Sequence, residues 1–189
     1  MKVYLDSVIW IDYAWGLYNH SEKIKYKSQK IIEAIKEKNI EVIYSLFSNV
    51  EVSAHFRDWI LLQKAIKDGY SHREFSRVKK NYKLTKRNKE KIEKLTQQIF
   101  DQLWVEHVDM KMMSEEHFEA FKTLTWTYQI DSIDALHNIV AREKRCDYLI
   151  TNDEDMRSGM KQFLSDINDQ QYDVIRPEEF INLLDKKPC

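Results

Sequence analysis

Apolar runs of strand length alternate along the chain with longer segments in which apolar residues recur every three or four positions. The second pattern gives a helix one apolar face, whereas a short apolar run is typical of a buried strand. The expected strands lie at residues 2–5, 40–44, 104–108, 147–151 and 172–175. Strands that alternate with helices form a mainly parallel sheet with right-handed crossovers, so the pattern predicts an α/β fold.

Helices are expected between these strands. The periodic segments lie at about residues 9–17, 21–38, 50–66, 114–124, 133–140 and 177–184. Ser114 and Asp131 stand where an N-cap is expected, and Pro177 suits the first turn of the last helix. Residues 152–155 suit a turn or a helix start equally well.

The composition agrees with one soluble globular domain, or with one domain that carries an insertion. Of the 189 residues 43% are hydrophobic and 32% charged, and the three Gly and two Pro favour long helices. Cys146 and Cys189 provide no disulfide framework, which indicates a reducing cytoplasm. No signal peptide is recognisable and no apolar run approaches the about 18 residues of a membrane span, so we expect a cytoplasmic protein without a membrane partner.

Positive charge is concentrated in one segment. Residues 57–103 contain 13 Lys and Arg against 6 Asp and Glu, although the net charge of the whole chain is -1. Residues 71–98 have few large apolar side chains, which predicts an extended, largely exposed helical arm. Such a charge run is either an ordinary solvated helix pair or a surface that binds phosphate groups. The candidate phosphate ligands are Arg73, Arg77, Lys79, Lys80, Lys83, Lys86 and Arg87.

Four carboxylates recur near the ends of the expected strands or near a helix start. Asp6 and Asp153 follow strands, Glu51 lies one to two turns into the next helix, and Asp134 is close to a helix start. Ligands of open parallel sheets bind at the C-terminal edge of the strands. Clustered carboxylates repel one another unless a cation joins them, and oxygen ligands favour Mg²⁺ or Mn²⁺ over zinc. One or two such ions support in-line displacement at phosphorus, so phosphodiester hydrolysis is the predicted reaction.

Each of these residues also has a structural interpretation. Asp6 could be a turn residue, and Glu51 a solvated helix residue. Asp131 is expected to be a helix N-cap, and Asp134 in the same first turn could complement the helix dipole instead of binding a metal. The coincidence of four carboxylates is what favours the metal site.

Two acidic residues and one histidine also allow both a structural and a functional interpretation. Asp153 and Asp155 would suit a turn or a helix start as well as a metal site. His137, three residues after Asp134, is either a structural histidine, which is the commoner case, or a partner of the site as a hydrogen-bonding group or general base.

Four motifs in this order resemble those of the PIN-domain nucleases. The resemblance extends over residues 1–56 and 104 to about 175, and each motif on its own is weak. The motifs are VYLDSVIW with Asp6, YSLFSNVEV with Glu51, IDALHNIVA with Asp134 and DYLITNDEDM with Asp153.

The resemblance implies a Rossmann-like α/β/α sandwich and a Mg²⁺- or Mn²⁺-dependent endoribonuclease that acts on RNA. Asp6, Glu51, Asp134 and Asp153 would form its acidic site, with Asp155 as a secondary ligand. The nearest relatives would be the VapC-like toxins, whose site an antitoxin often occupies. The chain would then be a single PIN-like domain over residues 1–189, with a basic helical insertion at about 57–103 that is longer than in the compact toxins.

The basic segment and the intact acidic positions leave three hypotheses. In the first, the protein cleaves RNA and the seven basic residues of the arm bind the phosphate backbone. In the second, it is a catalytically silent PIN-like module that binds RNA or a protein, although a degenerate site would have no need to keep all four carboxylates. In the third, it is a DNA-directed or structure-specific nuclease. A homodimer is compatible with each of them.

Overall fold

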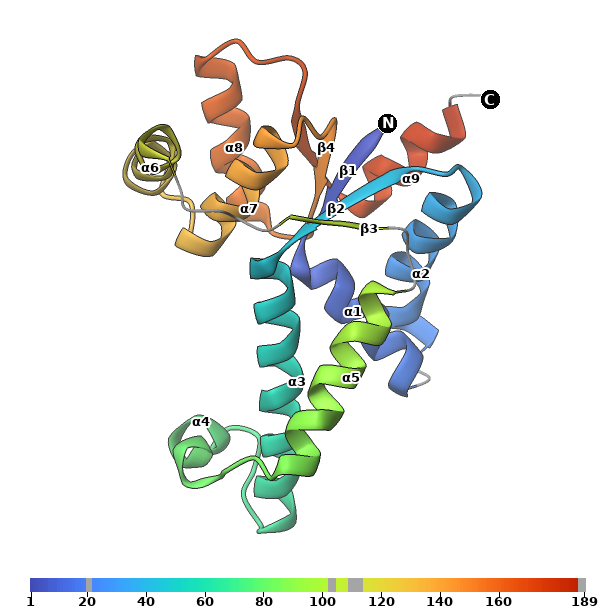
Figure 1. Ribbon diagram of the computed structural model, residues 1–189, viewed down its shortest axis with the longest axis vertical. Helices are drawn as coiled ribbons and strands as arrows, with labels where there is room; N and C mark the ends of the chain where they lie inside the picture. Colours follow the sequence, from blue (N-terminus) through green and yellow to red (C-terminus); the bar gives the residue numbers. More distant parts are fainter. Residues whose placement is uncertain (20–21, 102–104, 109–113, 187–189) are drawn as a thin grey trace.

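The central sheet has five strands, all of them parallel. The computed structural model describes residues 1–19, 22–101, 105–108 and 114–186. The strand order is β3-β2-β1-β4-β5, with β1 in the middle between β2 and β4 (Figure 1). The strands are β1 (Lys2–Leu5), β2 (Glu41–Ser45), β3 (Val105–Val108), β4 (Tyr148–Ile150) and β5 (Asp173–Ile175).

Helices connect the strands and cover both faces of the sheet (Figure 1). They are α1 (Ser7–Asn19), α2 (Glu22–Glu37), α3 (Leu46–Lys67), α4 (Phe75–Val78), α5 (Lys86–Phe100), α6 (Glu115–Lys122), α7 (Ser132–Glu143), α8 (Glu154–Asp166) and α9 (Pro177–Lys186). The 3₁₀ turn η1 (Lys79–Asn81) follows α4, and the π-helical turn η2 (Thr123–Thr127) follows α6.

Side chains of β1 point alternately into two hydrophobic cores. Val3 and Leu5 belong to the core under α1, α2, α5 and α9, whereas Tyr4 points to the opposite face, against α7 and α8. All three are fully buried. Because β1 is buried on both faces and paired on both edges, the residue that follows it is held firmly in place.

The predicted α/β fold with a mainly parallel sheet is confirmed, with two differences in detail. The structure contains α8, a segment for which the sequence analysis assigned only a turn or a helix start at its beginning. The third expected strand spans Val105–Val108, and Trp104, placed in that strand, lies outside the described residues. Asp131 and Ser114 are N-caps, as predicted.

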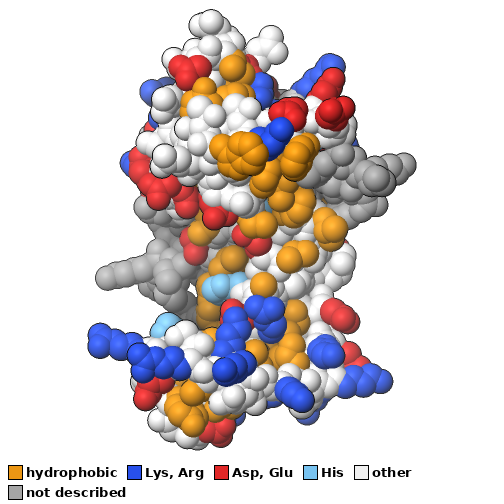
Figure 2. Space-filling view, turned by 90° about the vertical axis from the view of Figure 1, so that its left-hand side faces the viewer, with side chains coloured by type: hydrophobic (Ala, Val, Ile, Leu, Met, Phe, Trp, Pro, Cys, Tyr) orange, Lys and Arg blue, Asp and Glu red, His pale blue; other side chains and the backbone are white. Residues whose placement is uncertain are grey.

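Helix α3 and helix α5 form an arm that reaches away from the sheet (Figure 1). Gly69, with φ of 91°, ends the outward run, and Thr85 caps the returning helix by accepting a hydrogen bond from the backbone N–H of Asn88. Neither α4 nor η1 at the far end contains a buried residue. Figure 2 shows Lys and Arg side chains over this end of the molecule, with Asp and Glu side chains above them on the same face. Residues 71–98, expected to form an exposed helical arm, contain α4, η1 and most of α5, of which Ile92, Leu95 and Thr96 are buried.

Candidate metal centre

Asp6 is the most deeply buried of the candidate carboxylates, with 5% of its surface exposed. Its backbone N–H donates to the carbonyl of Ile150, so Asp6 still follows the line of β1 beside β4. Two hydroxyl groups donate to its carboxylate, that of Thr151 to Oδ2 at 2.5 Å and that of Ser7 to Oδ1 at 3.3 Å. The carboxylate is therefore fixed at the C-terminal edge of the sheet before any ligand binds.

Glu51 reaches the same edge from the second turn of α3 and is held by His137 of α7. The Nε2 atom of His137 lies 2.6 Å from Oε2 of Glu51. Because a carboxylate only accepts hydrogen bonds, Nε2 carries the hydrogen. The hydroxyl of Ser7, which donates to Asp6, also helps to lower the pKa of Glu51.

His137 is completely buried, and its second ring nitrogen is occupied as well. Nδ1 lies 2.7 Å from the hydroxyl of Tyr4, which in turn contacts the hydroxyls of Ser45 at 2.7 Å and Ser48 at 3.0 Å. Burial raises the pKa of Tyr4 well above its usual range, so the phenol remains a neutral hydroxyl. A chain of hydrogen bonds therefore runs from the end of β2 to the carboxylate of Glu51.

The charges of this group follow from burial and from hydrogen bonds. Burial raises the pKa of Asp6, although His137 and the hydroxyl of Thr151 oppose the shift. Burial alone would raise the pKa of Glu51. The hydrogen bond with His137 and the charge of His137, together with the hydroxyl of Ser7, outweigh burial and lower the pKa of Glu51. Glu51 is thus ionised in the folded protein.

Asp134 lies half-buried in the first turn of α7, on the same face as His137. Burial raises its pKa to about 7, and the negative charges of Asp6 and Asp153 add to the rise. Burial and the negative neighbours outweigh the opposing effect of His137. A cation beside Asp134 would reverse this shift.

Asp153 is exposed and is the N-cap of α8, where its Oδ1 accepts a hydrogen bond of 2.8 Å from the backbone N–H of Met156. Its own backbone N–H donates to the hydroxyl of Thr151 at 2.9 Å, the same hydroxyl that donates to Asp6. Thr151, which is fully buried, thereby ties the ends of β1 and β4 together.

The structure brings some of the predicted residues into one group and leaves others at its rim. Asp6, Glu51 and His137 each offer a ligand atom, and the three atoms lie within 4.8 Å of one another. Asp134 and Asp153 do not join that group in the structure, although their charges act on the same centre. Asp155 is exposed in the first turn of α8 and does not join it either.

Both ring nitrogens of His137 are used in hydrogen bonds, so we interpret it as the residue that orients Glu51 and not as a ligand. The alternative of a partner of the site, which the sequence left open, agrees with this geometry. Neither Thr151 nor Tyr4 was singled out in the sequence analysis. The only local signal was that Thr151 and Ser7 stand next to the ends of apolar runs.

The donor set fits a divalent cation. In the described part of the chain, no Lys or Arg nitrogen lies within 4.0 Å of the carboxylates of Asp6, Asp134 or Asp153. Buried carboxylates without a positive partner cost free energy that a bound metal ion would offset. The available donors are carboxylate oxygens, which hard divalent cations prefer.

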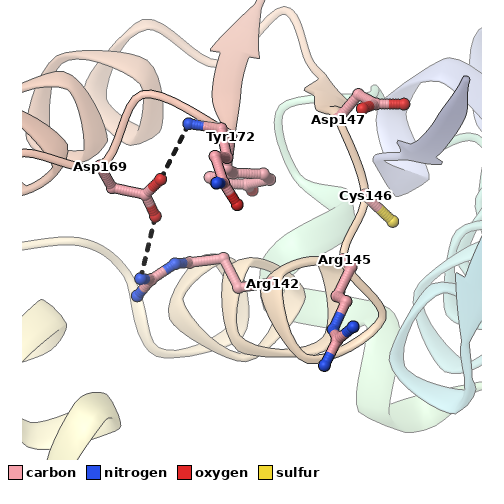
Figure 3. A pocket seen from close by; sticks show the side chains of 7 residues that line it. Arg142, Arg145, Cys146, Asp147, Asp169 and Tyr172 are labelled. Carbon is pink, nitrogen blue, oxygen red and sulfur yellow. Dashed lines mark hydrogen bonds and ion pairs between the residues drawn. The ribbon is translucent and has the colours of Figure 1, made fainter.

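A cavity of about 530 Å³ lies at the N-terminal ends of β4 and β5. It does not belong to the acidic centre, which lies at the C-terminal ends of the strands. Its lining includes the residues that lead into β4 (Figure 3). Asp6 and Asp153, by contrast, follow the ends of β1 and β4. Arg142 forms an ion pair of 3.1 Å with Asp169, which also accepts a hydrogen bond from the backbone N–H of Gln171. The lining residues are Arg142, Arg145, Cys146, Asp147, Asp169, Gln171 and Tyr172.

Comparison with known proteins agrees with this arrangement. A family model described as PIN domain matches residues 3–159, a segment that includes Asp6, Glu51, Asp134 and Asp153. A search among curated proteins finds no match. Among the described residues, no helix has both the length and the apolar character needed to cross a membrane.

Proposed function

Since the chain belongs to the PIN-domain family, whose members are typically metal-dependent nucleases, we propose that it is an endoribonuclease that hydrolyses phosphodiester bonds of RNA. The observation that carries this proposal is the pairing of buried Asp6 with Glu51 at the C-terminal edge of the sheet, close to the charge of Asp134. No described Lys or Arg neutralises Asp6 or Asp134, and a metal ion would do so.

We propose Mg²⁺ or Mn²⁺ as the cofactor, held by Asp6, Glu51, Asp134 and Asp153, with Asp155 as a secondary ligand. A bound ion of this kind supplies an activated water and stabilises charge at phosphorus. The protein contributes the positions of the carboxylates. Thr151 and Ser7 fix Asp6, and His137 fixes Glu51, so that both can bind the ion without rearrangement.

The positive charge of the basic arm supports the proposal that RNA is the substrate. Its end carries exposed Lys and Arg side chains on the face that also shows acidic side chains (Figure 2). Lys and Arg bind phosphate oxygens independently of sequence. The proposed phosphate ligands are Arg73, Arg77, Lys79, Lys80, Lys83, Lys86 and Arg87.

A toxin role is the finer form of this proposal. An antitoxin protein would then bind the acidic centre and be encoded beside the nuclease. A small acidic protein with a DNA-binding segment in the neighbouring reading frame, and its co-purification with this chain, would support that role. Absence of such a neighbour would leave a nuclease without the toxin role.

The test is cleavage of a mixed RNA pool with Mg²⁺ or Mn²⁺, with a chelator and with DNA as separate arms. We expect metal-dependent cleavage of RNA that the chelator abolishes. Asp153→Asn should abolish it too, whereas the matched control Asp185→Asn, in an exposed position on α9, should retain it. Full activity of the Asp153 variant would contradict the proposed site, and cleavage of DNA alone would contradict the substrate.

A further inference from the structure

Helix α3 connects the acidic centre directly to the basic arm. Glu51 and Asp58 are seven residues apart on this continuous helix, so they lie on the same face, about 10 Å apart along the axis. Asp58 forms an ion pair of 2.5 Å with Lys79 of η1. Farther along, about 20 Å from Glu51, the ammonium group of Lys64 donates to the carbonyl of Lys83 at 3.1 Å.

These contacts place the end of the arm at a fixed distance from the centre. Helix α5 packs along α3 through buried Ile92, Leu95 and Ile99, and a hydrogen bond of 3.2 Å joins the hydroxyls of Ser53 and Thr96. The two helices of the arm are therefore held in a fixed position relative to each other. A ligand held at its far end lies at a set distance from Glu51.

The far end has an excess of positive charge that the protein leaves unneutralised. Residues 71–89 contain eight Lys and Arg and a single acidic residue, Glu74, which accepts hydrogen bonds from Ser71. Within the part of the chain that the structure describes, Arg77, Lys80 and Lys83 are exposed and have no carboxylate within 4.0 Å. Such a cluster binds polyanions.

We propose that this cluster binds phosphates of the RNA strand at about three to six nucleotides from the cleaved bond, on one side only. A strand with stacked bases advances about 3.4 Å per nucleotide, so for such a strand about 10–20 Å along α3 corresponds to that number. The substrate must therefore extend about six nucleotides from the cleavage site toward the arm. This inference rests on the proposed ribonuclease function and specifies its substrate by length.

Contacts to phosphates carry no sequence information. The cluster thus sets the length and the orientation of the RNA, and leaves the choice of the cleaved bond to the acidic centre. Loss of the cluster should weaken binding and leave the chemical step unchanged.

The test uses the full-length protein and an RNA with one cleavage site, shortened from either end in single-nucleotide steps. For the wild type we expect KM to rise at least about tenfold once fewer than about six nucleotides remain on one side, with kcat unchanged. Shortening on the other side should have little effect. A KM that is independent of length on both sides would overturn the inference and leave the ribonuclease proposal intact, whereas no cleavage of any RNA would overturn both.

A variant of the arm provides the second measurement. The triple change Arg77→Gln, Lys80→Gln and Lys83→Gln should cleave the long RNA with the KM of the short one, and should lower the dependence of log KM on log salt by about two to three units. A matched triple change of exposed lysines outside the arm should leave the length dependence in place; it consists of Lys36→Gln, Lys161→Gln and Lys186→Gln. Equal behaviour of the two variants would overturn the inference.

Discussion

The acidic centre and the basic arm are held together by different kinds of contact. The centre is built from buried side chains that lie far apart in the sequence: the Tyr4 hydroxyl and His137 are separated by 133 residues, and Asp6 and Thr151 by 145. The arm is built from contacts within one stretch, such as that between Asp58 and Lys79, 21 residues apart and partly exposed. The geometry of the centre therefore depends on the whole fold, whereas that of the arm depends mainly on its two helices.

The largest effect is expected when one buried carboxylate of the centre is removed. Asp6→Asn should lower cleavage on the order of a thousandfold, because a ligand of the metal loses its charge. The fold should keep its stability, since burial raises the pKa of Asp6 and disfavours the charge that the variant removes. Cleavage rates and thermal unfolding without metal measure the two effects. An active variant, or one that unfolds, would contradict the assignment.

A smaller effect is expected for Tyr4, which contacts the proposed ligand Glu51 only through His137. Tyr4→Phe removes the hydroxyl that holds Nδ1 of His137, so Glu51 should be less well oriented, with about 10–100-fold loss in Mn²⁺ affinity or activity. Titration calorimetry with Mn²⁺ and cleavage assays measure this loss.

The matched control is Tyr172→Phe, because the hydroxyl of Tyr172 is also buried but donates to Asn138 instead of binding His137. Both variants remove one buried hydroxyl and should cost similar stability. If both lose metal affinity to the same extent, the hydrogen bonds of His137 have no special part in orienting Glu51.

The charge of Asp134 predicts how the metal-free protein responds to pH. Its pKa rises from the ordinary 3.8 to about 7 in the folded chain, so protonation favours folding. This stabilisation is fully present below about pH 4 and is lost as the pH rises through 7. Asp134→Asn should remove this dependence, so that its melting temperature exceeds that of the wild type by at least about 2 °C at pH 8, after allowance for solvent screening.

Melting curves at pH 5 and pH 8, with and without Mg²⁺, test this prediction. The difference between variant and wild type should be larger at pH 8, and Mg²⁺ should raise the stability of the wild type there. A difference that stays constant with pH would show that Asp134 does not titrate in this range.

The smallest effect is expected in the arm. Lys79→Met breaks the ion pair with Asp58, and an exposed pair of this kind contributes less than about 1 kcal/mol to stability. Urea unfolding should therefore detect little change, while Mn²⁺ affinity should stay the same. A loss of metal affinity in this variant would mean that the arm and the centre are coupled more strongly than their contacts indicate.

Much of the fold could be predicted because its signals are local. Asp131 and Ser114 cap helices within three residues of themselves, and the apolar runs that form the strands are short and bounded by polar residues. The α8 helix was missed, although Met156, Met160, Phe163 and Leu164 have helical spacing and are buried. The acidic residues at its start suit a turn as well as a helix start, so the local pattern does not decide between the two.

For the candidate site, the sequence indicates residue types but not the contacts between them. Asp6 and Glu51 could be found from their positions near strand ends. For His137 the sequence left two alternatives open, because its partners lie 86 and 133 residues away and nothing in the local pattern names them. Thr151 was overlooked for the same reason, since its bond to Asp6 forms only when β1 and β4 pair.

The hydroxyl of Thr151 that joins Asp6 to the backbone of Asp153 bears on when the proposed enzyme can act. During synthesis, Thr151 leaves the ribosome 145 residues after Asp6. The nascent chain therefore has β1 but cannot close the acidic centre around it. A nascent chain that ends before Thr151 should therefore lack the proposed cleavage activity, because nothing yet holds Asp6 from the side of β4.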